Sequence, residues 1–538
     1  MKNLSHFILS FLLIVCLCSF EESKQKIYNI ADYGAVGDGV IINTQTIQQI
    51  IDQCAEEGGG TIVVPKGIFK SGALFFKQGV NLHLEKGGVL KGTVNTDDYP
   101  VVDTRWEGIE QPWRSAFINA FGLDGFKLTG KGTIDGSGEE WAKIEWSSLM
   151  FGRPRLIAVQ NSKNVSISDI SVKNQACWGV FILYSHNVNI RDLTIGAAHY
   201  IPMSDGIDID SSIRVHISDC DIDVNDDCIA VKSGKDEDGR RVGKPSENIL
   251  IENCHFRYGH GGVSIGSEMS GGIRNVEVRH CTMEADNWAP VRFKSQPGRG
   301  GIVENIVYHD LTLKNTRQAF EFNMEWRMVP PIKPPSDPLP VIRNIKIINV
   351  SGTVEKVGIM HGLPDSPIQN VSFQNCHIKA KRGFVLENVE NIDLSGLHIT
   401  VEEGEPIVIR NTALRTNVFH KESLSSVSNP TAGEVATRFK NPPPQYSLSF
   451  YWGWDGKVTE EVIARDLDEF RSNNVSVVTI EPGYDMDSPY LSKGWFEKAE
   501  TAVRLAKERN MCVYLVDEGK YPSGFAGGKI SEEVPEFT

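Results

Sequence analysis

Four short runs in the middle of the chain carry side chains suited to acid–base chemistry on a charged substrate. They supply three carboxylates, one imidazole and two cations, which are Asp205, Asp226, Asp227, His260, Arg292 and Lys294. One protonated carboxyl could donate a proton while an ionised one activates water, the two roles that hydrolysis of a glycosidic bond requires. Because like charges disfavour ionisation, crowding the carboxylates would raise at least one pKa and keep an acid protonated near neutral pH.

Each of these runs is weak by itself, because an isolated Asp-Asp pair is usually a surface turn. A sequence repeat predicts the strands that would bring these side chains together. Each repeat has a polar residue, usually Asn, followed by an apolar, a more polar and an apolar residue. It begins at Asn164, Asn187, Arg214, Asn248, Asn275, Asn305, Asn344, Asn370 and Asn391, with shortest intervals of about 21 to 27 residues. Alternation of period two marks strands with one buried face, and a repeat of this size marks a stacked solenoid. We therefore predict an all-β fold, a right-handed parallel β-helix.

A second column of residues supports the repeat. The position six residues after each anchor is always apolar or cysteine: Ile170, Leu193, Cys220, Cys254, Cys281, Leu311, Val350, Cys376 and Leu397. We interpret these cysteines as small interior hydrophobes and not as disulfides or metal ligands. The chain has no Cys-x-x-Cys motif to support zinc.

On such a solenoid, Asp205 and the Asp226-Asp227 pair lie about one coil apart. Successive coils are about 4.8 Å apart, so matching positions form a ladder on one face. Other acidic residues alternate with apolar ones, and we interpret them as solvated strand faces: Asp208, Asp210, Asp219, Asp221 and Asp223.

Taken together, these runs resemble the family 28 glycoside hydrolases, the polygalacturonase family, over about residues 27–415. Entry motifs at 33–39, 58–62 and 130–136 add to the resemblance. It implies that Asp226 is the general acid, that Asp205 and Asp227 hold and activate water, and that His260 supports the acid. It also implies that Arg292 and Lys294 bind the substrate carboxylate. The expected substrate is a pectic polysaccharide or oligogalacturonide of the plant cell wall, cleaved with inversion and with no metal or other cofactor.

Some positions depart from the family pattern. Met203-Ser204-Asp205 stands where the family has Asn-Thr-Asp, and Phe293 replaces Ile between the two cations. These changes preserve the reaction type but leave the sugar and linkage open. The charged loop 235–241 resembles that of exo-acting members, and its charges could block one end of the groove. The resemblance therefore favours exo-cleavage.

The ends of the chain suggest export and a second domain. Residues 1–20 read as a signal peptide, which predicts a secreted or periplasmic protein, with a lipid anchor at Cys16 or Cys18 as the alternative. No other segment is expected to span a membrane, and a net charge of -14 argues against nucleic acid as a partner. We expect a monomer.

The β-helix domain is predicted over 24–415, with a capping helix at 46–54, and is followed by a Ser-, Thr-, Asn- and Pro-rich linker over 416–444. Residues 445–538 alternate strand and helix patterns, which indicates an incomplete α/β segment. This segment resembles the start of a family 106-like rhamnosidase barrel.

Two other functions remain open. A β-helix also serves calcium-dependent, pectate lyase-like enzymes, in which Asp226 and Asp227 would be metal ligands. It also serves non-catalytic carbohydrate-binding proteins, in which loss of Asp226 would leave binding intact.

Overall fold

The structure, a computed structural model, describes residues 26–284, 287–327, 338–411, 449–473, 475–483 and 485–516. The chain divides into two compact units, Met1–Phe419 and His420–Thr538, which are described separately. The predicted signal peptide and linker lie outside the described residues.

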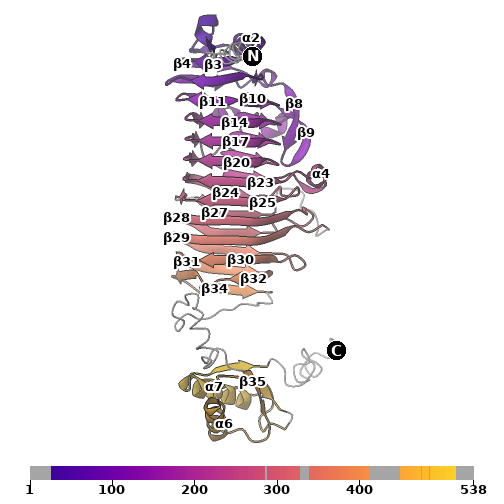
Figure 1. Cartoon of the computed structure of the whole chain (residues 1–538), viewed down its shortest axis with the longest axis vertical. Coiled ribbons are helices and arrows are strands. Elements are labelled where there is room, and N and C mark those ends of the chain that lie inside the picture. Colours follow the sequence, from indigo (N-terminus) through magenta and orange to yellow (C-terminus); the bar gives the residue numbers. More distant parts are fainter. Residues whose placement is uncertain are drawn as a thin grey trace, which may run out of the picture. The chain divides into compact units, whose positions relative to one another are not determined.

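The first unit is a parallel β-helix, as predicted, in which successive coils stack strand on strand (Figure 1). We name its three sheets faces A, B and C. Face A contains β5 (Leu74–Phe76), β10 (Ile118–Phe121), β13 (Ile157–Gln160), β16 (Val180–Leu183), β19 (Ile207–Asp210), β22 (Asp227–Lys232), β27 (Asn287–Lys294) and β34 (Ile407–Arg410).

Face B contains β1 (Ile27–Asn29), β3 (Gly60–Val64), β6 (Val80–Leu84), β11 (Lys127–Gly130), β14 (Lys163–Ser168), β17 (His186–Arg191), β20 (Ile213–Ser218), β23 (Ser246–Glu252), β25 (Ile273–Arg279), β30 (Ile368–Gln374) and β32 (Val389–Asp393). Face C contains β2 (Asp38–Ile42), β4 (Gly67–Ser71), β7 (Gly88–Gly92), β12 (Thr133–Asp135), β15 (Ser171–Lys173), β18 (Thr194–Gly196), β21 (Asp221–Asp223), β26 (Thr282–Met283) and β33 (Leu397–Val401). Four longer strands run around corners from one face to the next: β24 (His255–Ile265), β28 (Ile302–Asn323), β29 (Val341–His361) and β31 (Cys376–Glu387).

The repeated Asn has a structural cause that the sequence pattern did not reveal. All nine anchor positions adopt left-handed backbone, as at Asn164 with φ 56° and Asn305 with φ 58°. Asn tolerates this conformation better than most residues. Its side chain also bonds the equivalent residue of the neighbouring coil, as Asn187 Nδ2 does to Asn164 Oδ1 at 3.0 Å. The anchors therefore form ladders of hydrogen bonds that hold the coils in register.

The predicted interior column is confirmed. All nine of its residues are buried, from Ile170 to Leu397, and belong to the core. The eight described cysteines form no disulfide with one another; seven of them are buried and Cys512 is exposed. The column thiols donate only weak hydrogen bonds to nearby backbone carbonyls, as Cys220 Sγ does to Ser218 O at 3.2 Å, which fits their reading as small hydrophobes.

The connections between faces differ in length. Between face B and face C, only two residues separate β14 from β15, β17 from β18, β20 from β21, β23 from β24 and β25 from β26. The longer connecting segments lie before and after the face A strands. One of these contains the hairpin described next, and another contains α4 (Asp236–Val242).

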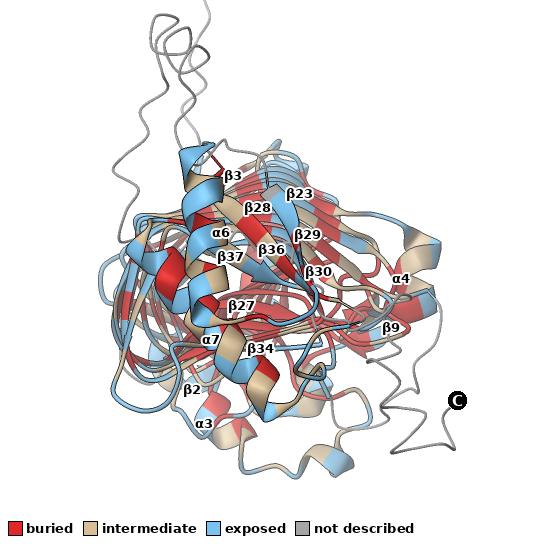
Figure 2. Ribbon diagram, turned by 90° about the horizontal axis from the view of Figure 1, so that it is seen from below, coloured by how far each residue is buried: buried red, intermediate tan, exposed pale blue. Residues whose placement is uncertain are grey.

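An antiparallel hairpin, β8 (Val101–Trp106) and β9 (Ile109–Arg114), projects from the β-helix. We did not predict it from the sequence. Figure 2 shows α4 beside β9 at one edge of the molecule, and Lys235 N donates to Gly108 O at 2.8 Å at the hairpin tip. The hairpin and the α4 loop therefore form one continuous wall.

Short helices complete the first unit. The capping helix predicted at 46–54 is α2 (Thr44–Glu56), which buries Ile47, Ile50, Ile51 and Cys54 against the first coils. The others are η1 (Ile30–Tyr33), η2 (Thr96–Asp98), α3 (Gly138–Trp141) and η3 (Trp146–Ser148). In the part of the chain that the structure describes, no helix has the length and apolar character needed to cross a membrane.

The second unit is α/β, as predicted. Its elements are β35 (Ser449–Trp454), α6 (Glu460–Ser472), β36 (Val477–Pro482), α7 (Lys493–Glu508) and β37 (Cys512–Leu515), with the three strands parallel. Alternate strand residues, among them Trp452 and Ile480, form a core with the helices.

Candidate active site

The register of face A brings the three carboxylates together. Ile207 of β19 pairs with Ile229 of β22, so Asp205 and Asp227, two residues earlier, occupy matching positions on adjacent coils. Gly206 N donates to Asp227 O at 3.0 Å and fixes this match. One oxygen from each of Asp205, Asp226 and Asp227 lies within 4.8 Å of the others. The prediction that adjacent coils gather these acids is confirmed.

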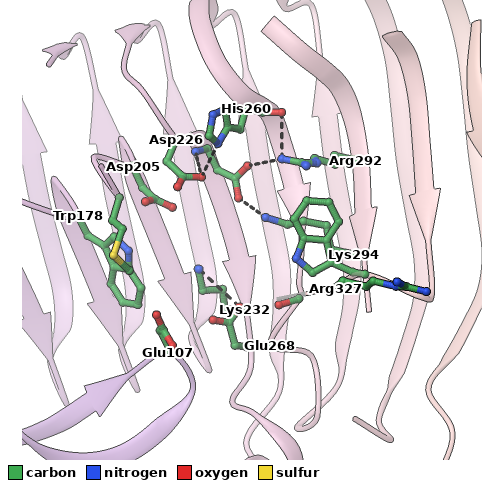
Figure 3. A pocket seen from close by; sticks show the side chains of 14 residues that line it. Glu107, Trp178, Asp205, Asp226, Lys232, His260, Glu268, Arg292, Lys294 and Arg327 are labelled. Carbon is green, nitrogen blue, oxygen red and sulfur yellow. Dashed lines mark hydrogen bonds and ion pairs between the residues drawn. The ribbon is translucent and has the colours of Figure 1, made fainter. Parts of the chain in front are cut away.

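Two cations from later coils hold one of these carboxylates (Figure 3). Lys294 Nζ donates to Asp227 Oδ2 at 2.5 Å, and Arg292 Nη1 reaches Asp227 Oδ1 at 3.3 Å. Arg292 also donates from Nε to Glu321 at 2.7 Å. Ser264 Oγ donates to Asp227 Oδ1 at 2.7 Å. Both predicted cations therefore lie in the site, and both are bonded to Asp227.

These contacts shift the pKa values of Asp205 and Asp227 in opposite directions. Burial and the charges of Asp208 and Asp226 raise the pKa of Asp205 well above its usual value. Burial alone would also raise the pKa of Asp227, but Lys294 and Arg292 outweigh it and lower that pKa. The crowded site thus shifts the pKa of Asp205 upward and the pKa of Asp227 downward, and the upward shift has the direction predicted for crowded carboxyl groups.

His260 lies beside Asp226. Its Nδ1 is 3.5 Å from Asp226 Oδ1, and its backbone N donates to Asp226 O at 3.0 Å. The bond to Asp226 raises the pKa of His260. Burial would raise the pKa of Asp226, but the bond from His260 and the charge of Lys294 lower it. These contacts favour a charged His260 imidazolium beside an ionised Asp226 carboxylate.

The same cavity, of about 280 Å³, extends beyond the predicted residues. Its further lining consists of Glu107, Trp178, Met203, Lys232, Ser267, Glu268, Trp326 and Arg327. Sequence reasoning assigned no role to these residues. The register offered a signal for one of them: Lys232 pairs with Asp210 in the face A ladder and is the last residue of β22, the strand that begins at Asp227.

Asp208 and Asp210 are not solvated, and that prediction was wrong. Both are fully buried, because the hairpin covers the outward side of β19. Arg105 of β8 donates to Asp210 Oδ1 at 2.7 Å, with 0% and 1% of the two side chains exposed. Asp208 Oδ1 lies 3.4 Å from Lys232 Nζ. Alternation distinguishes two sides of a strand but does not show which structure covers the outer one.

Aromatic stacking fixes the hairpin over the cavity. The Trp106 ring lies between Trp113, with centroids 4.1 Å apart, and Trp178, at 4.6 Å. Arg241 of α4 donates to Glu110 of β9 at 2.6 Å. The wall therefore borders the cavity at Glu107, which lies near Trp178 in Figure 3.

A cation could in principle use the three carboxylates as ligands. The donor chemistry does not favour it, because Asp227 already accepts from Ser264 and Arg292 on one oxygen and from Lys294 on the other. The positive charge in this site comes from side chains.

Comparisons with known proteins agree with this geometry. The chain is 30% identical to a probable polygalacturonase of Vitis vinifera over 66% of this chain and 74% of the relative. It is 29% identical to an exo-poly-alpha-D-galacturonosidase of Dickeya chrysanthemi over 54% of this chain and 55% of the relative.

A solved structure is also similar. It is a hyperthermoactive exopolygalacturonase from Thermotoga maritima, with a TM-score of 0.61 and 27% identity, covering 72% of this chain and 92% of that one. The family described as glycosyl hydrolases family 28 matches residues 54–409. The chain therefore belongs to family 28 of the glycosyl hydrolases.

Proposed function

We propose that this protein hydrolyses α-galacturonosidic linkages in pectic polysaccharide. The observation that carries the proposal is the cluster of Asp205, Asp226 and Asp227 within 4.8 Å, in the same cavity as Arg292 and Lys294. The names of the relatives, polygalacturonase and exo-poly-alpha-D-galacturonosidase, support galacturonan as the substrate.

In the proposed reaction, Asp226 protonates the leaving glycosidic oxygen while water attacks the anomeric carbon. Asp227, held ionised by Lys294, accepts the proton of that water, and Asp205 helps to hold it. Asp226 is charged in the free protein, so it must first receive a proton. Bound sugar would exclude solvent and favour neutral Asp226, with the His260 imidazolium as the donor. Arg292 and Lys294 set the charge of Asp227, and we also propose that they bind the substrate carboxylate, as the family resemblance implies.

We propose inversion at the anomeric carbon, as the family resemblance implies. One oxygen from each of the three carboxylates lies within 4.8 Å of the others, whereas the two carboxyl groups of inverting enzymes usually stand about 6.5–9.5 Å apart. Inversion instead depends on Asp205 and Asp227 sharing one water. Proton NMR of the first-formed product distinguishes the outcomes, because inversion yields the β-anomer from an α-linkage.

We also propose exo-cleavage. The hairpin and α4 loop close the cavity at Glu107 and Trp178, so a chain end fits where a continuous polymer would meet the wall. Export, action on the plant cell wall and a monomeric state remain predictions. So does the resemblance of the second unit to a rhamnosidase barrel, since the family match ends at residue 409.

Chromatography of products from polygalacturonate and defined oligogalacturonides tests the function, with and without chelator. We expect saturated monomeric or dimeric products, unaffected by chelator, that Asp226→Asn abolishes. Unsaturated products, or activity lost on chelation, would indicate a lyase. Tight binding with no product from any galacturonide would indicate a carbohydrate-binding protein.

A further inference from the structure

The cavity has two halves with different cations. In the half that holds the three carboxylates, Arg292 bonds Asp227, Glu321 and the backbone oxygen of His260, and Lys294 bonds Asp227. Each of these two cations therefore already donates to at least one protein acceptor. The walled half, near the hairpin, contains a different cation, Lys232.

Lys232 is buried yet has no close acceptor. Its side chain is 7% exposed, and its Nζ lies 3.4 Å from Asp208 and 3.6 Å from Glu268. Among the described residues, neither these carboxylates nor any other group accepts a hydrogen bond from Nζ. Both oxygens of Asp208 are likewise buried without a hydrogen-bond partner. An ammonium group has three N–H donors, so this one is available to a ligand entering the cavity.

The surroundings keep Lys232 charged and in place. Burial opposes the charge, but Glu268 and Asp208 outweigh it and raise the pKa of Lys232. Burial would raise the pKa of Glu268, but Lys232 and Arg299 lower it to about 2. The Trp178 ring lies 4.7 Å from Nζ and is itself held by Trp106. Lys232 is therefore a fixed positive charge at the closed end of the cavity (Figure 3).

We propose that Lys232 is a specificity-determining residue that binds the carboxylate of the sugar in the walled half of the cavity. This inference rests on the proposed function and adds to it the position at which a free acid is required. A carboxylate would give the ammonium a charge-assisted hydrogen bond, whereas a methyl ester or the hydroxymethyl group of galactose offers only neutral acceptors. The site should therefore prefer a terminal galacturonate to its methyl ester.

Kinetics on matched substrates test this inference. The substrates are a galacturonide with a free terminal acid and the same oligomer with that acid methyl-esterified. We expect Lys232→Gln to lower kcat/KM for the acid by about 10–100-fold, mainly by raising KM, because the lost contact exists in the ground state as well. For the ester we expect a change of less than about 3-fold, so that the variant loses the preference for the acid.

The matched control is Lys244→Gln. Lys244 lies over the Tyr184 ring at 4.3 Å and lines a different cavity, so its loss should change neither substrate's kinetics. Lys232→Arg keeps the charge and should retain a preference for the acid, which allows a test if Lys232→Gln fails to fold. Wild type that cleaves acid and ester equally well would overturn the inference without any variant.

Two failures can be told apart. If the wild type releases no product from any galacturonide, the proposed function fails. If the wild type cleaves galacturonides but Lys232→Gln loses activity equally on acid and ester, Lys232 has only a structural role and the inference fails.

Discussion

Replacing Arg105 with Met should loosen the wall that closes the cavity. The Arg105–Asp210 pair is 2.7 Å long with 0% and 1% of the side chains exposed, so the variant leaves a buried carboxylate without its partner. Breaking one side of such a pair usually costs about 3–5 kcal/mol. Arg155 is a second buried cation that acts on Asp210, so we expect the lower end, about 3 kcal/mol.

Urea unfolding of the wild type and of Arg105→Met would measure this cost, and product sizes from polygalacturonate would report on the wall. We expect lower stability together with a shift from monomeric or dimeric products toward longer ones. Arg105→Met with Asp210→Leu removes both charges, and it should recover most of the lost stability because apolar replacements of buried pairs are often neutral. The double variant also restores wild-type product sizes if the wall closes again.

Two results would refute this reasoning. One is a stability for Arg105→Met within about 1 kcal/mol of the wild type with unchanged products, which would mean that the pair does not hold the hairpin. The other is a double variant no more stable than the single one, since the cost would then not come from an unpaired charge.

Further predictions concern the catalytic and buried ionisable groups. Asp226→Asn should lower kcat by about 10²–10⁴-fold with an unchanged unfolding midpoint, and an unchanged kcat would exclude Asp226 as the acid. Because His260 has a raised pKa and supplies its proton from the charged form, activity should fall as pH rises through that pKa; His260→Gln should remove this limb of the kcat/KM profile. The pKa of Glu268 is lowered from 4.5 to about 2, so its stabilisation is complete above pH 4.5 and lost as pH falls toward 2. This amounts to about 3 kcal/mol, and thermal unfolding across that window should show a smaller loss for Glu268→Gln than for the wild type. Since the described cysteines form no disulfide with one another, a reducing agent should leave the melting temperature unchanged, and a large drop would point to a disulfide.

The β-helix could be predicted because each coil repeats the same short pattern of polar and apolar residues. The anchor residues and the column six positions later both recur in the sequence, so the coils and their core were recognisable without any long-range information. The acids could be predicted to meet for the same reason, since Asp205 and Asp227 differ by one coil.

The wall could not be predicted in this way. The run 101–114 has strand-forming residues around Glu107-Gly108, but nothing local indicates that it folds back over β19. That long-range contact decides whether Asp208 and Asp210 face water or protein, so both were assigned wrongly. The distribution of charge among the carboxyls depends on Lys294 and Arg292, which approach from later coils, and so required the structure as well.

The connections between the faces of the β-helix differ in length, and they therefore differ in how well they tolerate insertions during evolution. Five successive face B to face C turns, from β14–β15 to β25–β26, have the same two-residue length, so insertions there would disturb the register of the later coils. The ends of face A accept segments as long as a hairpin or a helix without disturbing the stack. New substrate preferences can therefore arise by exchanging loops while the face A strands that bear the catalytic residues stay unchanged. Chimaeras built at these junctions should keep the fold and alter which substrates enter the cavity.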